Sequence, residues 1–121
     1  MKAVFDTNIL IDYLNGVEKA AAELELYDER YISVITQIEV LVGADDAKEE
    51  HLIRRFLTGF KVRELSPVIA EATVRLRKEL SLKVPDAIVY ATAREEGCML
   101  VTRNTRDFEV EWPDVREPYC L

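Results

Sequence analysis

Short segments of strand-like composition alternate along this chain with longer segments of helical periodicity. The first segment, Lys2–Phe5, is apolar and is followed directly by an acidic residue. Such an alternation predicts parallel strands joined by crossover helices, because a tight turn cannot connect two parallel strands. We expect strands at residues 2–5, 30–34, 61–65 and 98–101, with a short fifth strand near Val115. The predicted fold class is α/β, with a central parallel sheet of four to five strands and helices on both faces.

The segments between the strands carry start and stop signals of helices. Ser66 followed by Pro67 is a typical helix start, and Gly43 and Gly97 each follow a periodic segment that they are expected to end. The expected helices cover residues 7–15, 18–26, 36–42, 45–57, 66–80 and 86–96. In the helix at 45–57 the charges face outward, and the residues expected to face inward are Leu52, Ile53, Phe56 and Leu57.

Length and composition limit the class of protein. The chain has 121 residues, and no linker rich in Gly, Ser or Pro divides it, so residues 1–121 are predicted to form a single domain. Its longest apolar run, residues 87–91, is too short for a transmembrane helix, and we expect no membrane association. The 23 acidic and 16 basic residues give a net charge of −7, which argues against a protein that holds nucleic acid by basic surface alone.

Cysteine and histidine are scarce in this sequence. Cys98 and Cys120 have no C-x-x-C spacing, which favours reduced thiols and a cytoplasmic location. His51 is the only histidine. A zinc site with several His or Cys ligands and a Cys–His nucleophilic pair are therefore poorly supported.

Three carboxylates stand at positions that invite two interpretations each. Asp6 follows the first strand, where it is either a helix N-cap or a site residue. Glu39 has apolar helical neighbours, so it is either paired in a buried site or placed on a solvated edge of its helix. Asp86 begins a helix, where a carboxylate also interacts favourably with the helix dipole.

The topology favours the functional interpretation when these residues are considered together. Asp6, Asp86 and the segment that follows the fourth strand, with Asn104 and Asp107, all fall at one end of the predicted sheet, and Glu39 falls close to it. Neighbouring carboxylates raise one another's pKa, so a cluster of them needs a cation to stay ionised. Ligands that are all oxygen suit Mg²⁺ (or Mn²⁺) better than zinc. We therefore expect a Mg²⁺ or Mn²⁺ site.

Four segments of the chain resemble the motifs of the PIN domain family. They read DTNILID at residues 6–12, TQIE at 36–39, PDAIVYATA at 85–93 and LVTRNTRDF at 100–108. The similarity extends from Val4 to Phe108, and the VapC-type toxins of prokaryotic toxin–antitoxin pairs match the chain in size. The resemblance implies a PIN-like fold and a metal-dependent endoribonuclease that hydrolyses RNA phosphodiester bonds.

The resemblance also assigns roles by position. Asp6, Glu39 and Asp86 would be catalytic and would hold the metal. The fourth acidic position is open between two residues: many relatives have an acid where this chain has Asn104, and Asp107 is the other frequent position. We expect Asp107 to supply the charge and Asn104 to act as a neutral ligand or substrate contact.

Further residues are predicted to support the site. Asn8 and Thr102 would orient Asp6, and Arg103 and Arg106 would contact the RNA backbone. Weaker candidates for such contacts, which are better explained as a solvated helix face, are Arg75, Arg77, Lys78 and Lys83.

The family implies partners as well. VapC-type toxins are generally dimers silenced by an antitoxin, so a homodimer, a cognate antitoxin and an RNA substrate such as tRNA or mRNA are expected. The alternatives are a PIN nuclease of RNA processing outside a toxin system and a catalytically silent interaction module. A phosphorelay receiver domain is excluded, because the candidate third strand ends in Leu65-Ser66 instead of an aspartate.

Overall fold

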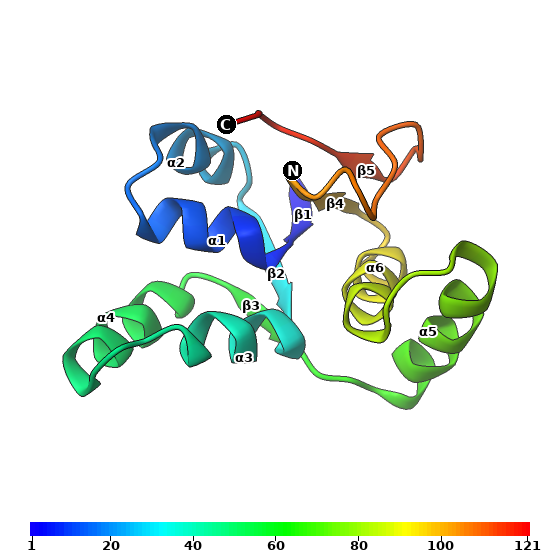
Figure 1. The fold of residues 1–121 in the computed structure, drawn as a ribbon, viewed down its shortest axis with the longest axis horizontal. Coiled ribbons are helices and arrows are strands. Elements are labelled where there is room, and N and C mark those ends of the chain that lie inside the picture. The colour runs from blue at the N-terminus through cyan, green and yellow to red at the C-terminus, as the bar shows by residue number, and fades with distance from the viewer.

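A single five-stranded sheet runs through the middle of the protein (Figure 1). The computed structural model describes residues 1–121. The strands lie in the order β3-β2-β1-β4-β5, and every neighbouring pair is parallel. Their bounds are β1 Lys2–Phe5, β2 Glu29–Ser33, β3 Lys61–Arg63, β4 Met99–Val101 and β5 Val115–Arg116. The predicted parallel sheet is confirmed, including its short fifth strand, but β3 ends at Arg63 and not at residue 65, and Val34 belongs to α3 and not to β2.

Helices cover both faces of this sheet, as predicted (Figure 1). They are α1 Thr7–Leu14, α2 Glu18–Glu25, α3 Val34–Val42, α4 Ala47–Leu57, α5 Pro67–Leu80 and α6 Val84–Glu96. The longest, α5, has 14 residues, and none of the six combines the length and the apolarity that crossing a bilayer requires.

Alternate residues of the strands enter two separate cores. Val4 and Leu100 point to the face covered by α5 and α6, whereas Phe5 and Val101 point to the face covered by α1, α2, α3 and α4. This division follows from the two-residue period of a strand, which sends successive side chains to opposite faces. Helix α6 lies between the sheet and α5, so residues 87–93 are buried on every side.

Four details of the predicted helices are wrong. Helix α6 begins at Val84 and not at residue 86, with Pro85 in its first turn. Helix α3 begins at Val34 and not at residue 36, because the Ser33 hydroxyl accepts a hydrogen bond from the Ile35 amide at 3.1 Å and caps the helix directly after β2. Helix α4 begins at Ala47, since Asp46 is its N-cap. Leu52 does not face inward with Ile53, Phe56 and Leu57, because it lies on the exposed side of α4.

Candidate active site

The carboxyl ends of β1 and β4 bring Asp6 and Thr102 together. Asp6 directly follows β1 and N-caps α1, and its side chain is only 6% exposed. Its Oδ1 accepts a hydrogen bond from the Thr7 amide at 2.8 Å. Its Oδ2 accepts one from the Thr102 hydroxyl at 2.8 Å and one from Asn8 Nδ2 at 3.1 Å. Asp6 is therefore both a cap and a rigidly held carboxylate, and the expected contacts of Asn8 and Thr102 with it are present.

Glu39 reaches the same place from α3. Its side chain is exposed, so the solvated-edge interpretation describes its environment, yet its Oε1 accepts a hydrogen bond from the Thr7 hydroxyl at 2.6 Å. The Thr36 hydroxyl lies 3.3 Å from that of Thr7. Sequence reasoning missed Thr7 in this role, although its place between Asp6 and Asn8 is a usable signal. Thr7 links the carboxylates of the first and second motifs.

Asp86 is partly buried in the first turn of α6, and its side chain forms no hydrogen bond. Burial, followed by the charges of Asp6, Asp107 and Glu39, raises the pKa of Asp86 to about 6. Burial also raises the pKa of Asp6, with a further contribution from the charge of Glu39. The four predicted carboxylates thus form one electrostatic cluster.

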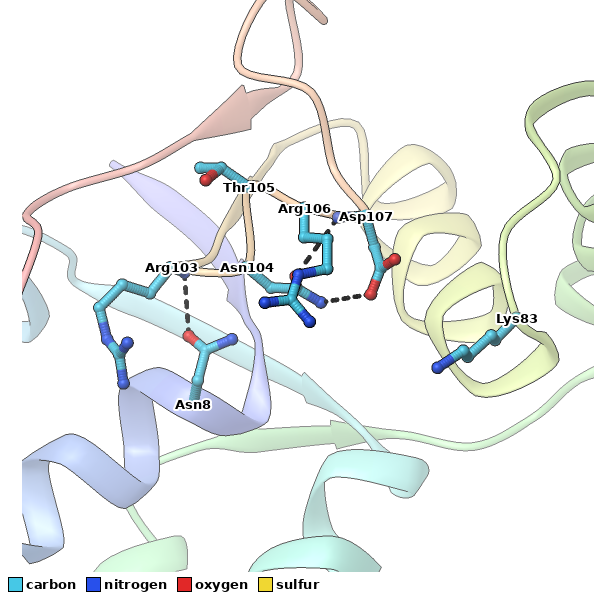
Figure 2. Close-up of a pocket in the computed structure, with 7 residues that line it drawn as sticks. All are labelled: Asn8, Lys83, Arg103, Asn104, Thr105, Arg106 and Asp107. Atoms are coloured by element: carbon cyan, nitrogen blue, oxygen red, sulfur yellow. Dashed lines mark hydrogen bonds between the residues drawn. The ribbon is translucent and has the colours of Figure 1, made fainter.

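Asn104 and Asp107 act together in the segment after β4. Asn104 Nδ2 donates to Asp107 Oδ2 at 2.9 Å, and the Asp107 amide donates back to Asn104 Oδ1 at 3.3 Å (Figure 2). The amide of Asn104 in turn donates to the Thr102 hydroxyl at 3.0 Å. Both residues therefore line the same cavity, and Asn104 fixes the direction of the Asp107 carboxylate.

The donor set of this cluster has the chemistry of a site for a hard divalent cation. All the candidate ligands offer oxygen atoms, and the mutual repulsion of the carboxylates is what a cation would relieve. The side chains do not converge to metal-binding spacing in this structure, where no group of three or more His, Cys, Asp or Glu is gathered closely enough. The fit to a cation therefore rests on the type and charge of the donors.

A cavity of about 670 Å³, lined by polar and charged residues, adjoins the carboxylates (Figure 2). Lys83 and Arg106 extend their cationic ends toward it from two different segments, and neither takes part in an ion pair or a side-chain hydrogen bond. The seven lining residues are Asn8, Lys83, Arg103, Asn104, Thr105, Arg106 and Asp107.

Arg103 lines the cavity with its side chain engaged by another residue, and its contact with the RNA backbone stays a prediction. Its Nε and its terminal nitrogen donate to the two carboxylate oxygens of Asp12 at 2.6 and 2.8 Å, so its guanidinium is already paired. The weaker candidates divide: Lys83 lines the cavity, whereas Arg75, Arg77 and Lys78 lie exposed on α5 and do not line it.

Comparisons with known proteins identify the family of the chain. The family model of the PIN domain matches residues 3–111, a range that includes all four clustered carboxylates. The chain belongs to the PIN domain family. This PIN domain is 32% identical over 121 aligned positions to a Ribonuclease VapC of Rickettsia bellii, with 90% of each chain covered. It is 30% identical to a tRNA(fMet)-specific endonuclease VapC of Shigella flexneri, covering 90% of this chain and 91% of the relative.

A solved structure extends the similarity to three dimensions. One chain of a toxin–antitoxin complex from Klebsiella pneumoniae superposes on this PIN domain with a TM-score of 0.93 and 45% identity. The superposition covers 98% of this chain and 99% of the other. The PIN-like fold implied by the four motifs is therefore confirmed.

Proposed function

We propose that this PIN domain is a metal-dependent endoribonuclease and the toxin of a VapBC-type toxin–antitoxin pair. The observation that carries the proposal is the carboxylate cluster at the end of the sheet, where Asp86 has no hydrogen-bond partner and three other acids raise its pKa. The names of the two relatives, a Ribonuclease VapC and a tRNA-specific endonuclease, support RNA as the substrate. The Klebsiella complex supports the toxin role.

Asp6, Glu39 and Asp86 would hold the ion, Mg²⁺ or Mn²⁺. When bound, such an ion lowers the pKa of a water molecule and neutralises charge that develops on the phosphoryl oxygens.

The residues of the chain divide the remaining work. Asp6 is fixed by three hydrogen bonds, which gives the site one carboxylate of set position. Glu39 or Asp107 would orient the attacking water and accept its proton, since both lie at the open edge of the cluster. Arg106 and Lys83, which are unpaired at the polar cavity, would bind RNA phosphates.

Cleavage of RNA by wild type and Asp6→Asn tests the proposal. We expect the substitution to lower kcat by about 10²-fold or more, because it removes a charge from the centre of the cluster. EDTA should abolish wild-type cleavage, and added Mg²⁺ or Mn²⁺ should restore it. Asp45→Asn is the matched control, since Asp45 is exposed between α3 and α4.

Two outcomes of this assay would contradict the proposal. One is equal cleavage by wild type and Asp6→Asn. The other is cleavage that survives EDTA, which would leave the carboxylates without a metal to bind.

If the protein is a toxin of this type, we expect it to bind an antitoxin and to form a homodimer. The net charge of the site is negative, and a carboxylate cluster can bind an arginine side chain of a partner in a bidentate manner. We therefore expect an inhibitory protein that inserts an arginine here. Light scattering on the purified chain measures the expected homodimer directly.

A further inference from the structure

Two ion pairs of nearly identical construction, each with a buried carboxylate and a partly exposed arginine, connect the N-terminal helices to the C-terminal part of the chain. Asp12 of α1 and Glu23 of α2 are each 5% exposed. Asp12 accepts two hydrogen bonds from Arg103, at 2.6 and 2.8 Å, and Glu23 accepts two from Arg116, at 2.7 and 2.9 Å.

A tyrosine completes each pair. Tyr119 donates its hydroxyl to Asp12 at 2.8 Å, and Tyr27 donates its hydroxyl to Glu23 at the same distance. The two carboxylates therefore match in charge, in burial and in the number of hydrogen bonds that they accept, so one pair can serve as a control for the other.

Only the first pair is linked to the carboxylate cluster through a hydrogen-bonding side chain, that of Asn8. The backbone amide of Arg103 donates to Asn8 Oδ1 at 3.0 Å, and Asn8 Nδ2 donates to Asp6 at 3.1 Å and to the Thr102 hydroxyl at 3.2 Å. Asn104, the residue after Arg103, donates its amide to the same hydroxyl. The guanidinium of Arg103 thus anchors to α1 the segment that carries Asn104 and Asp107.

The second pair reaches the site only through the sheet. Arg116 accepts a hydrogen bond from the Thr102 amide at 3.0 Å with its backbone carbonyl. This bond belongs to the pairing of β4 with β5 and does not involve the Arg116 side chain. Removing the charge of Glu23 leaves it in place.

We propose that Asp12 and Arg103 are a positioning pair, which holds Asn8 and Thr102 against Asp6 and fixes the segment of Asn104 and Asp107 relative to it. The expected effect of this pair on catalysis rests on the proposed nuclease function. Its expected effect on the position of the segment does not. Asp12 touches none of the four clustered carboxylates and acts through Arg103 and Asn8.

Asp12→Asn and Glu23→Gln form a matched test. Both variants remove one buried charge and leave one arginine without its carboxylate, so comparable losses of stability are expected. Asp12→Asn should lower kcat for RNA cleavage by about tenfold or more with little change in KM, because displaced reacting groups are costly. Glu23→Gln should leave kcat unchanged at a temperature where both variants are folded.

Hydrogen exchange of two amides supplies a readout that needs neither metal nor RNA. The amides of Arg103 and Asn104 are hydrogen-bonded to the side chains of Asn8 and Thr102. In Asp12→Asn their exchange should speed up by about tenfold or more, since local opening no longer has to break the ion pair. In Glu23→Gln it should remain at the wild-type rate.

Arg103→Lys and Arg116→Lys repeat the comparison with the charge retained, in case Asp12→Asn does not fold. A lysine cannot bind both oxygens of a carboxylate in the planar manner of arginine. Arg103→Lys should therefore loosen the same two amides and lower kcat, whereas Arg116→Lys should do neither.

Equal exchange rates and equal kcat values within each matched pair would overturn the positioning role. If wild type cleaves no RNA but the amides of Arg103 and Asn104 still respond to Asp12→Asn alone, the nuclease proposal fails and the positioning role stands.

Discussion

Asp86 is compatible both with a helix start and with a functional site, and its environment distinguishes these two interpretations. An aspartate in the first turn of a helix is ordinarily stabilising, by about 0.3–1 kcal/mol. Here its carboxylate accepts no hydrogen bond from the helix, and burial together with three neighbouring acids raises its pKa from 3.8 to about 6. In the metal-free protein the ionised form of Asp86 therefore lowers the free energy of unfolding.

The stability of the metal-free protein therefore depends on pH. Because the folded state holds the Asp86 proton more tightly than the unfolded state, this group destabilises the fold progressively as pH rises through about 6. The full shift corresponds to roughly 3 kcal/mol, which solvent screening at the open site reduces to about 1 kcal/mol. Asp86→Asn should therefore be more stable than wild type by about 1 kcal/mol at pH 7.5 in EDTA, and the difference should vanish near pH 4.

Urea unfolding at the two pH values measures this difference, with Asp45→Asn as a control that shows none. If Asp86→Asn were instead less stable than wild type at pH 7.5, by an amount that shrinks towards pH 4, Asp86 would be only a helix-start residue.

At the scale of elements, two glycines end helices in different ways. Gly97 follows α6 with a φ of +66°, in the left-handed region that side chains with a Cβ adopt at a cost. Gly43 follows α3 with a φ of −73°, and a Cβ there would meet the Val40 carbonyl oxygen at an ordinary 3.4 Å. The sequence pattern treats the two alike, whereas the backbone requires glycine only at Gly97.

Gly97→Ala should destabilise the protein by about 1 kcal/mol, and Gly43→Ala should change its stability by less than about 0.5 kcal/mol. Chemical denaturation of both variants measures the difference. Similar values for the two would contradict the assignment of strain to Gly97 alone.

For the whole molecule, the net charge of −7 and the short supply of free cations at the site limit how RNA is held. With two phosphate contacts, from Lys83 and Arg106, the logarithm of RNA affinity should fall with the logarithm of salt with a slope of about −1.4. Lys83→Gln should reduce that slope by about 0.7, whereas Lys78→Gln on α5 should leave it unchanged.

Fluorescence anisotropy of single-stranded RNA on the Asp6→Asn protein gives these slopes without cleavage. A slope several times steeper, or the same slope for Lys83→Gln and Lys78→Gln, would show that a wider basic surface binds the RNA.

The strands and helices could be predicted from the sequence, because their signals are local. The mostly apolar segment Lys2–Phe5 predicts a strand, and Pro67 begins α5 in the place where proline is favoured. The start of α3 could not be predicted, since the Ser33 side chain caps the helix with no intervening turn. One contact between distant residues, that of Thr102 with Asp6, was expected from the resemblance to the family, whereas other contacts between distant residues were missed.

Arg103 is the clearest example of such a contact. In sequence it is indistinguishable from a surface cation beside a nuclease site, and its partner Asp12 lies 91 residues away. Thr7 and Glu39, 32 residues apart, are a second case. Pairings of this kind depend on the packing of helices against the sheet, which periodicity does not encode.

The long-range contacts of Asp6 and Asp12 have a consequence for synthesis on the ribosome. Asp6 receives the Thr102 hydroxyl from 96 residues downstream, and Asp12 receives Arg103 from 91 and Tyr119 from 107 residues downstream. While translation has not yet reached β4, Asp6 has its local contacts with Thr7 and Asn8 but lacks that with Thr102, and an unpaired Asp12 opposes the docking of α1. We therefore expect a nuclease built in this way to stay inactive until the segment that follows β4 has been synthesised.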